Sequence, residues 1–152
     1  MTRTSRHPTR TRRLSLPAHP SAVPWARRLL CQTLRGWGLD GLADPAQLLV
    51  SELVTNAVKA AGAASRRGGG PGGQAPVSLT LTLTDTCLEL EVWDASPGSP
   101  VLREPGPTAE CGRGLLIVDM LSSSWGQRPA DGGKVVWCEL GLPAAAGRVS
   151  GT

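Results

Sequence analysis

Apolar residues recur with helical spacing in two stretches of the first half of the chain. In residues 22–37 and again in residues 45–61 they stand three or four positions apart, which predicts two amphipathic helices. Ser21 precedes the first helix as an N-cap, and Asp44-Pro45 opens the second with an N-cap and a proline in the first turn. Glycines are expected to end the helices: Gly36, Gly38 and Gly62.

In the second half of the chain the spacing of the apolar residues changes from the helical period to a strict alternation with polar residues. Residues 77–83 alternate Val and Leu with Ser and Thr, and residues 87–93 alternate in the same way after a tight turn. These two segments predict an antiparallel hairpin. Residues 125–128 and 134–140 flank a turn that contains Pro and Gly, and they predict a second hairpin.

Shorter signals complete the pattern. Leu14-Ser15-Leu16 predicts a short edge strand, and residues 66–73 form a glycine-rich loop. Residues 95–112 carry several Pro and Gly and predict a long irregular loop, which in a compact domain is usually functional or mobile. Gly114–Ser122 is expected to be a short, deeply buried helix.

Helices followed by hairpins predict an α+β fold, a two-layer sandwich with helices on one face of a mixed, mostly antiparallel sheet. A chain of 152 residues allows one domain with a real core. With five Trp but no Phe or Tyr, that core must be built from Leu, Val, Ala and Trp. The expected organisation is a disordered basic arm (1–13), a folded domain (14–143) and a flexible tail (144–152).

Charge is distributed unevenly along the chain, although the net charge is only +4. No acidic residue precedes Asp40, whereas eight arginines do, so the basic character belongs to the N-terminal end. Such an arm contacts nucleic acid or an acidic partner, or it is a solvated disordered leader. We expect the leader, because no aromatic stacking platform or nucleic-acid motif accompanies the arginines.

The remaining composition excludes several classes of protein. The four cysteines form no C-x-x-C pair and have no histidine nearby, so no zinc site is predicted. No apolar run approaches the roughly 20 residues of a membrane span, and no apolar region follows the N-terminal arginines as in a signal peptide. We therefore expect a reduced cytoplasmic protein that does not bind a membrane.

Three groups of residues carry candidate chemistry. Glu52 and Asn56 lie one turn apart on the second helix, where a carboxylate and an amide suit Mg²⁺; the alternative is a solvated polar stripe. Asp94 ends a strand and either caps a turn or accepts a hydrogen bond from the amino group of a base. The Gly-Arg-Gly of residues 112–114 precedes a helix, which favours anion binding but is common in plain turns.

The order of these groups resembles the N, G1 and G2 boxes of the GHKL ATPase superfamily. The chain is most similar to actinobacterial anti-sigma-factor serine/threonine kinases, over roughly residues 14–142. The resemblance implies the Bergerat fold, with ATP and Mg²⁺ as ligands. The three boxes are Glu-Leu-Val-Thr-Asn-Ala at 52–57, Trp-Asp-Ala-Ser-Pro-Gly at 93–98 and Gly-Arg-Gly-Leu-Leu-Ile-Val at 112–118.

The resemblance also implies a role for each residue. Glu52 is the general base that polarises an attacking hydroxyl, which belongs either to water or to a partner serine. Asn56 ligates the Mg²⁺ that bridges the phosphates, and Asp94 accepts a hydrogen bond from the adenine amino group. The resemblance further implies that Gly98 contacts the base and that residues 99–111 form a lid. The implied phosphate-binding residues are Gly112, Arg113, Gly114 and Leu115.

The sequence departs from the family pattern at three positions. Ala60 stands where relatives often carry histidine, and Ser96 where they commonly have glycine. Val135 replaces the threonine of a Gly-Lys-Thr, which implies that a hydroxyl near the adenine is missing. Lys134 either reaches a phosphate or is a solvated hairpin lysine.

Two functions follow from the resemblance. The first is a serine/threonine kinase that phosphorylates an antagonist protein and, when free, holds a sigma factor. The second is a non-catalytic ATP-binding switch that acts through protein–protein interaction. Because related kinases dimerise, a homodimer is also expected, and direct binding to nucleic acid is not.

Overall fold

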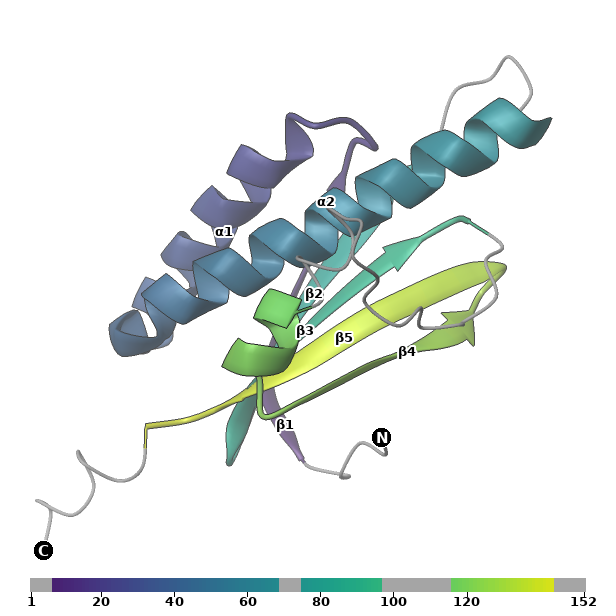
Figure 1. Cartoon of the computed structure of the whole chain (residues 1–152). Helices are drawn as coiled ribbons and strands as arrows, with labels where there is room; N and C mark the ends of the chain where they lie inside the picture. Colours follow the sequence, from purple (N-terminus) through teal and green to yellow (C-terminus); the bar gives the residue numbers. More distant parts are fainter. Residues whose placement is uncertain (1–6, 69–74, 97–115, 144–152) are drawn as a thin grey trace, which may run out of the picture.

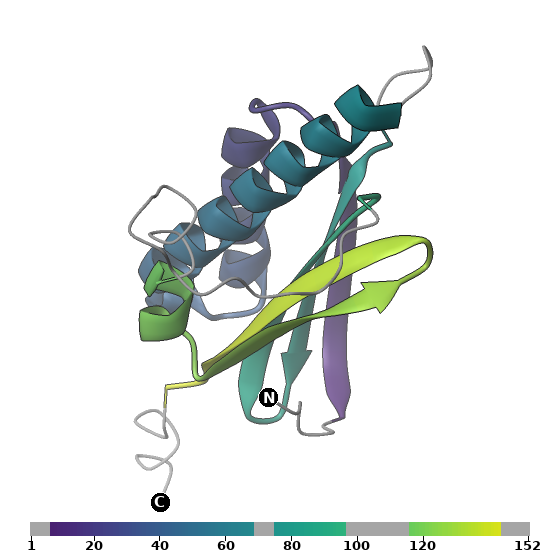
Figure 2. The same ribbon diagram turned by 45° about the vertical axis from the view of Figure 1, so that its right-hand side comes forward.

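The computed structural model describes residues 7–68, 75–96 and 116–143 (Figure 1). They form a five-stranded sheet in the order β1-β2-β3-β5-β4, and the helices pack on one of its faces (Figure 2). The predicted two-layer α+β fold is therefore confirmed. Each of the four pairings in this sheet is antiparallel, so the parallel pair that a mixed sheet requires is not found among the described strands.

The elements follow the predicted order, and both predicted hairpins, β2–β3 and β4–β5, are present. The strands are β1 (Pro8–Leu16), β2 (Val77–Thr84), β3 (Cys87–Asp94), β4 (Ser124–Ala130) and β5 (Gly133–Gly141). The helices are α1 (Ala22–Gly36), a 3₁₀ turn η1 (Asp40–Leu42), α2 (Ala43–Gly68) and a short helix at residues 116–121.

Helix α1 ends as predicted, but its first turn is arranged differently. Gly38 adopts a φ of +75°, and the N–H of Leu39 donates to the carbonyl of Leu34 at 2.7 Å, which is a Schellman motif. Ser21 does precede the helix, yet its hydroxyl lies 3.0 Å from Nδ1 of His19 and makes no cap hydrogen bond. The glycine therefore defines the end of α1 more clearly than the serine defines its start.

Helix α2 is longer than predicted, because it continues through Gly62 to Gly68. Glycine inside a helix costs about 1 kcal/mol relative to alanine, but it ends a helix only where it adopts a positive φ. Gly62 is not among the residues with positive φ, and the buried side chain of Ala61 keeps this part of the helix against the core. Residues 66–68 of the predicted loop therefore belong to α2, and the rest of that predicted loop, residues 69–73, lies outside the described residues.

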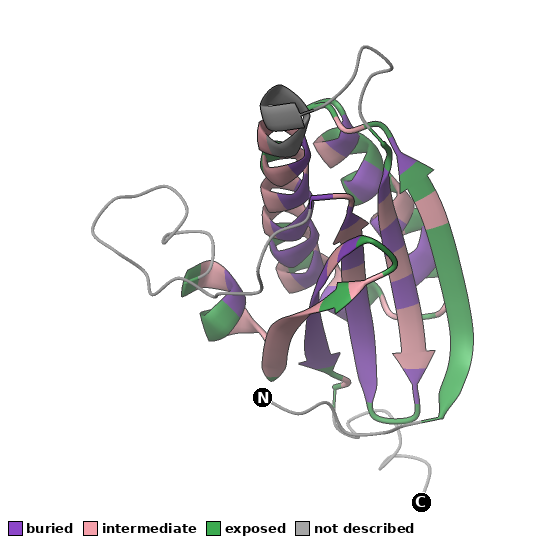
Figure 3. Cartoon of the chain, turned by 90° about the vertical axis from the view of Figure 1, so that its right-hand side faces the viewer, coloured by how far each residue is buried: buried purple, intermediate pink, exposed green. Residues whose placement is uncertain are grey.

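Strand β1 corrects the expected disorder of the N-terminal arm. It begins at Pro8, so residues 8–13 belong to the sheet, where Arg12 lies opposite Leu81 of β2. These residues are exposed (Figure 3), and arginine and threonine suit a solvent-facing edge strand that must not pair with other chains. The arm had no apolar alternation to predict a strand, because neither of its faces is buried before Leu14.

The short helix at residues 116–121 is only partly buried, contrary to the prediction. Val118 is fully buried in the core, but 51% of Leu116 and 73% of Met120 is exposed. The helix is therefore amphipathic, with one side packed on the domain and the other facing solvent.

The core between the helices and the sheet is aliphatic, as predicted for Leu, Val and Ala, but Trp, which was also expected, lies only at its margin, where Trp37 and Trp125 are partly buried. Its largest fully buried side chains are Leu30, Leu34, Leu49, Leu53, Leu79, Leu81, Leu88, Leu90, Val50, Val54, Val77 and Val92. Within the described ranges, the chain contains no helix that is both long and apolar enough to span a bilayer.

We expect Leu53→Ala to lower the free energy of unfolding by about 2–5 kcal/mol, since it opens a cavity beneath α2. Leu48→Ala is the matched control on the same helix, because 52% of Leu48 is exposed, and it should change stability by less than about 0.5 kcal/mol. Urea unfolding followed by tryptophan fluorescence measures both. Equal losses in the two variants would contradict the described packing of α2.

Candidate functional site

The candidate site begins with Asp94, the last residue of β3. Strand alternation places its side chain on the same face as Leu90 and Val92, which belong to the core covered by the helices. The carboxylate has no solvent exposure, and across the β3–β5 pairing it lies opposite Lys134. A charged group without solvent contact needs compensating partners.

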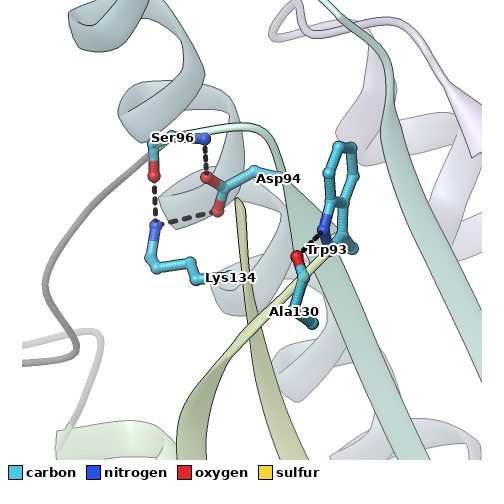
Figure 4. Close-up of polar contacts among 5 residues, drawn as sticks. All are labelled: Trp93, Asp94, Ser96, Ala130 and Lys134. Carbon is cyan, nitrogen blue, oxygen red and sulfur yellow. Dashed lines mark hydrogen bonds and ion pairs between the residues drawn. The ribbon is translucent and has the colours of Figure 1, made fainter. Parts of the chain in front are cut away.

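Two groups compensate the Asp94 carboxylate (Figure 4). Its Oδ1 accepts the backbone N–H of Ser96 at 2.8 Å, and its Oδ2 accepts a hydrogen bond from Nζ of Lys134 at 2.9 Å. Lys134 also donates to the hydroxyl of Ser96 at 2.9 Å, so the three residues form a closed network. An ionised carboxylate has about four acceptor positions, so Asp94 retains capacity for a further donor.

This network corrects both interpretations of Lys134. The side chain is only 14% exposed and is paired with Asp94, so it is neither a solvated hairpin lysine nor directed away toward a phosphate. Ser96, a departure from the family pattern, is buried and supplies a hydroxyl to the same network. The pairing of Asp94 with Lys134 could not be predicted, because it depends on which strands are neighbours in the sheet.

The structure also changes the expected consequence of the departure at position 135. Val135 lies opposite Trp93 in the β3–β5 pairing, so its side chain is on the other face of the sheet from Asp94. The position whose side chain reaches Asp94 is Lys134. The expectation that valine at position 135 deprives the Asp94 region of a hydroxyl is therefore wrong for this chain.

Gly133 allows β5 to approach the end of β3. A Cβ at this position would overlap the carbonyl oxygen of Asp94 and lie 3.0 Å from Cα of Ala95. The turn just before it has positive φ at Asp131 (48°) and Gly132 (78°), which is the type I′ geometry that suits a two-residue hairpin. The β4–β5 turn and the Asp94 network are therefore built on adjacent residues.

Trp93 lies on the opposite side of β3 from Asp94. Its indole N–H donates to the carbonyl of Ala130 at 2.7 Å and so ties the tip of the β4–β5 hairpin to β3 (Figure 4). A cleft of about 430 Å³ opens beside it on the sheet face that the helices do not cover, here called the outer face. Because Asp94 points to the other face, this cleft is separate from the candidate site.

Glu52 and Asn56 supply the second part of the site. They lie one turn apart on α2, next to the fully buried Leu53, and both are half-buried. Helix α2 packs on β3, the strand that ends at Asp94. The pair is therefore on the flank of the buried stripe, and its carboxylate and amide oxygens are donors of the type that Mg²⁺ accepts together with water and phosphate.

Ala60 continues this flank one turn beyond Asn56 and is also half-buried. Because alanine has no polar atom in its side chain, the position where relatives often carry histidine adds neither a ligand nor a proton donor here. The other nucleotide-binding residues predicted from sequence lie outside the described residues: Gly98, Gly112, Arg113, Gly114, Leu115 and the lid at 99–111. Their roles stay predictions.

The chain matches a known protein family. A family model described as the histidine kinase-like ATPase domain matches residues 16–139, which extend from the end of β1 into β5 and include Glu52, Asn56 and Asp94. No curated protein matches the sequence.

We expect Gly133→Ala to lower the free energy of unfolding by about 1–3 kcal/mol and to weaken ATP binding, because the added methyl group displaces the backbone of Asp94. The matched control is Gly141→Ala at the other end of β5, where an added Cβ meets no atom within 4 Å. Urea unfolding and titration calorimetry with ATP test both variants. If Gly133→Ala had the same stability and ATP affinity as Gly141→Ala, the result would contradict the close approach of β5 to Asp94.

Proposed function

The chain belongs to the histidine kinase-like ATPase domain family, and we propose that this ATP-binding domain acts as a serine/threonine kinase of the anti-sigma-factor type. Its substrate is a hydroxyl of an antagonist protein, and in the absence of that antagonist it holds a sigma factor, as a monomer or a homodimer. The observation that carries the proposal is Glu52, a half-buried carboxylate one turn from Asn56 on α2. A domain that only binds ATP does not need a base at this position.

Asp94 supports adenine as the base of the nucleotide. Its carboxylate is held by the N–H of Ser96 and by Lys134, and it can accept one more hydrogen bond, from the exocyclic amino group of adenine. Guanine presents a carbonyl oxygen at the equivalent ring position, and two acceptors would then face each other at a carboxylate that has no solvent exposure. Because an unmade hydrogen bond at a buried acceptor is costly, this contact discriminates between the bases.

Glu52 and Asn56 support phosphoryl transfer. When bound, Mg²⁺ neutralises part of the charge on the phosphates, and the amide oxygen of Asn56 is a neutral ligand for it. Glu52 accepts the proton of the attacking hydroxyl, whose oxygen bonds to the γ-phosphorus as ADP leaves. The domain itself contributes positioning and charge rather than a covalent intermediate.

A non-catalytic switch is the second candidate, and Ala60 favours it. The flank of α2 that carries Glu52 and Asn56 has no third polar group at this position. In this alternative, ATP alters the binding of a partner protein, and Glu52 has no chemical role.

We expect Asp94→Asn to weaken ATP binding by about tenfold to a hundredfold, because a hydrogen bond to a charged group contributes roughly 1.5–3 kcal/mol. Titration calorimetry with ATP and GTP measures the effect and its base selectivity. Asp85→Asn, in the exposed β2–β3 turn at the other end of β3, is the matched control and should bind ATP normally. Unchanged affinity in Asp94→Asn would refute the adenine contact.

Glu52→Gln should keep ATP affinity but slow phosphate transfer by about a hundredfold or more, since the amide cannot take the proton. The assay follows γ-labelled phosphate onto purified candidate antagonists encoded beside the gene of this protein. Asp44→Asn, an exposed acid on the same helix, serves as the matched control and should transfer at the wild-type rate. If the wild-type protein transferred phosphate to none of the candidates, the kinase proposal would be refuted and the non-catalytic switch would stand.

A further inference from the structure

Lys134 has a hydrogen-bond donor that the described residues do not use. A lysine ammonium carries three N–H donors and no acceptor. Two of them are taken by Oδ2 of Asp94 and by the hydroxyl oxygen of Ser96, each at 2.9 Å, and no third acceptor for Nζ occurs among the described residues. Because the side chain is only 14% exposed, an unused donor here costs more free energy than it would at the surface.

The ammonium group is held in a fixed place beside the Asp94 carboxylate (Figure 4). The register of β3 and β5 puts Lys134 directly opposite Asp94, and Gly133 lets the two strands approach closely. The hydroxyl of Ser96 then holds Nζ from a second side. A donor that is already positioned loses little conformational entropy when a ligand binds, so it contributes more to affinity than a freely rotating surface lysine does.

Side by side, the Asp94 carboxylate and the Lys134 ammonium present an acceptor and a donor. Adenine presents the complementary pair on its six-membered ring, because its amino group is attached next to N1, which is an acceptor and the most basic nitrogen of the ring system. Guanine has the reverse at these two positions, a carbonyl oxygen and an N–H. In one orientation of the base, the two side chains therefore match adenine at both positions and guanine at neither.

We propose that Lys134 is a second specificity-determining residue of the ATP site, and that it donates its third N–H to N1 of adenine while Asp94 accepts from the amino group. Ser96 is a positioning residue, which acts by holding the ammonium group of Lys134. This inference rests on the proposed function in requiring that ATP binds at Asp94. It does not depend on phosphate transfer or on Glu52.

The full-length wild-type protein is tested first, by titration calorimetry with ATP and with 1-deaza-ATP, in which a C–H replaces N1. We expect 1-deaza-ATP to bind about tenfold to a hundredfold more weakly, because the hydrogen bond from a charged donor is lost. The matched control ligand is 7-deaza-ATP, which lacks the ring nitrogen on the other side of the amino group and should bind like ATP. Equal affinity for ATP and 1-deaza-ATP would overturn the proposal, and so would a loss of affinity with 7-deaza-ATP alone.

Lys134→Met shows whether the interaction with N1 belongs to this residue. The variant should bind ATP more weakly and should no longer distinguish ATP from 1-deaza-ATP. If Lys134 only stabilised the charge of Asp94, the affinities for both nucleotides would fall by the same factor and the discrimination would persist, which would overturn the proposal. Arg128→Met is the matched control, because it removes a cation that lies 3.5 Å from another β3 carboxylate, that of Glu91, on the outer face. Both affinities should be unchanged in this variant.

Ser96→Ala covers the case in which Lys134→Met does not fold, because it leaves the ion pair between Asp94 and Lys134 in place. It should reduce the discrimination against 1-deaza-ATP without abolishing it, and unchanged discrimination would overturn the positioning role of Ser96. If the wild-type protein bound no ATP, this inference and the proposed function would both be overturned. If it bound ATP without discriminating against 1-deaza-ATP, the inference alone would be overturned.

Discussion

The fixed charge of Asp94 is the constraint around which this end of the sheet is built. A carboxylate without solvent contact persists only with partners, and these come from two directions: the N–H of Ser96 in its own chain segment and the ammonium of Lys134 from β5. Lys134 reaches it because β3 and β5 are neighbours, and they approach closely because Gly133 has no side chain. Strand order, the turn and one missing Cβ together determine the geometry of the site.

Helix α2 connects this network to the proposed chemistry. Its buried stripe, which includes Leu49 and Leu53, fixes the rotation of the helix on the sheet. That rotation leaves Glu52 and Asn56 at the flank, where both are half-buried. The position of the catalytic candidate therefore follows from packing of residues that have no chemical role.

Local patterns predicted most of the fold, and long-range pairing accounts for most of what they missed. The periodic helices and both hairpins were confirmed, and so was the placement of Glu52 and Asn56 on a helix and Asp94 at a strand end. The edge strand predicted at Leu14-Ser15-Leu16 is the end of β1, whereas residues 8–13 of β1 escaped prediction because a polar edge strand has no apolar alternation. The role of Lys134 was missed since it lies 40 residues from Asp94, and Gly62 was misjudged because packing overrode its local preference.

The central position of β3 has a consequence for how the domain opens. An interior strand with neighbours on both sides exchanges its amide hydrogens only in the most extensive opening reactions, whereas an exposed edge strand opens with little free energy. Asp94 is on β3, and β1 is one of the two edge strands of the described sheet. Fraying of β1 therefore leaves the hydrogen bonds around Asp94 intact, and the end of the sheet that carries Asp94 persists through local fluctuations that release the N-terminal strand.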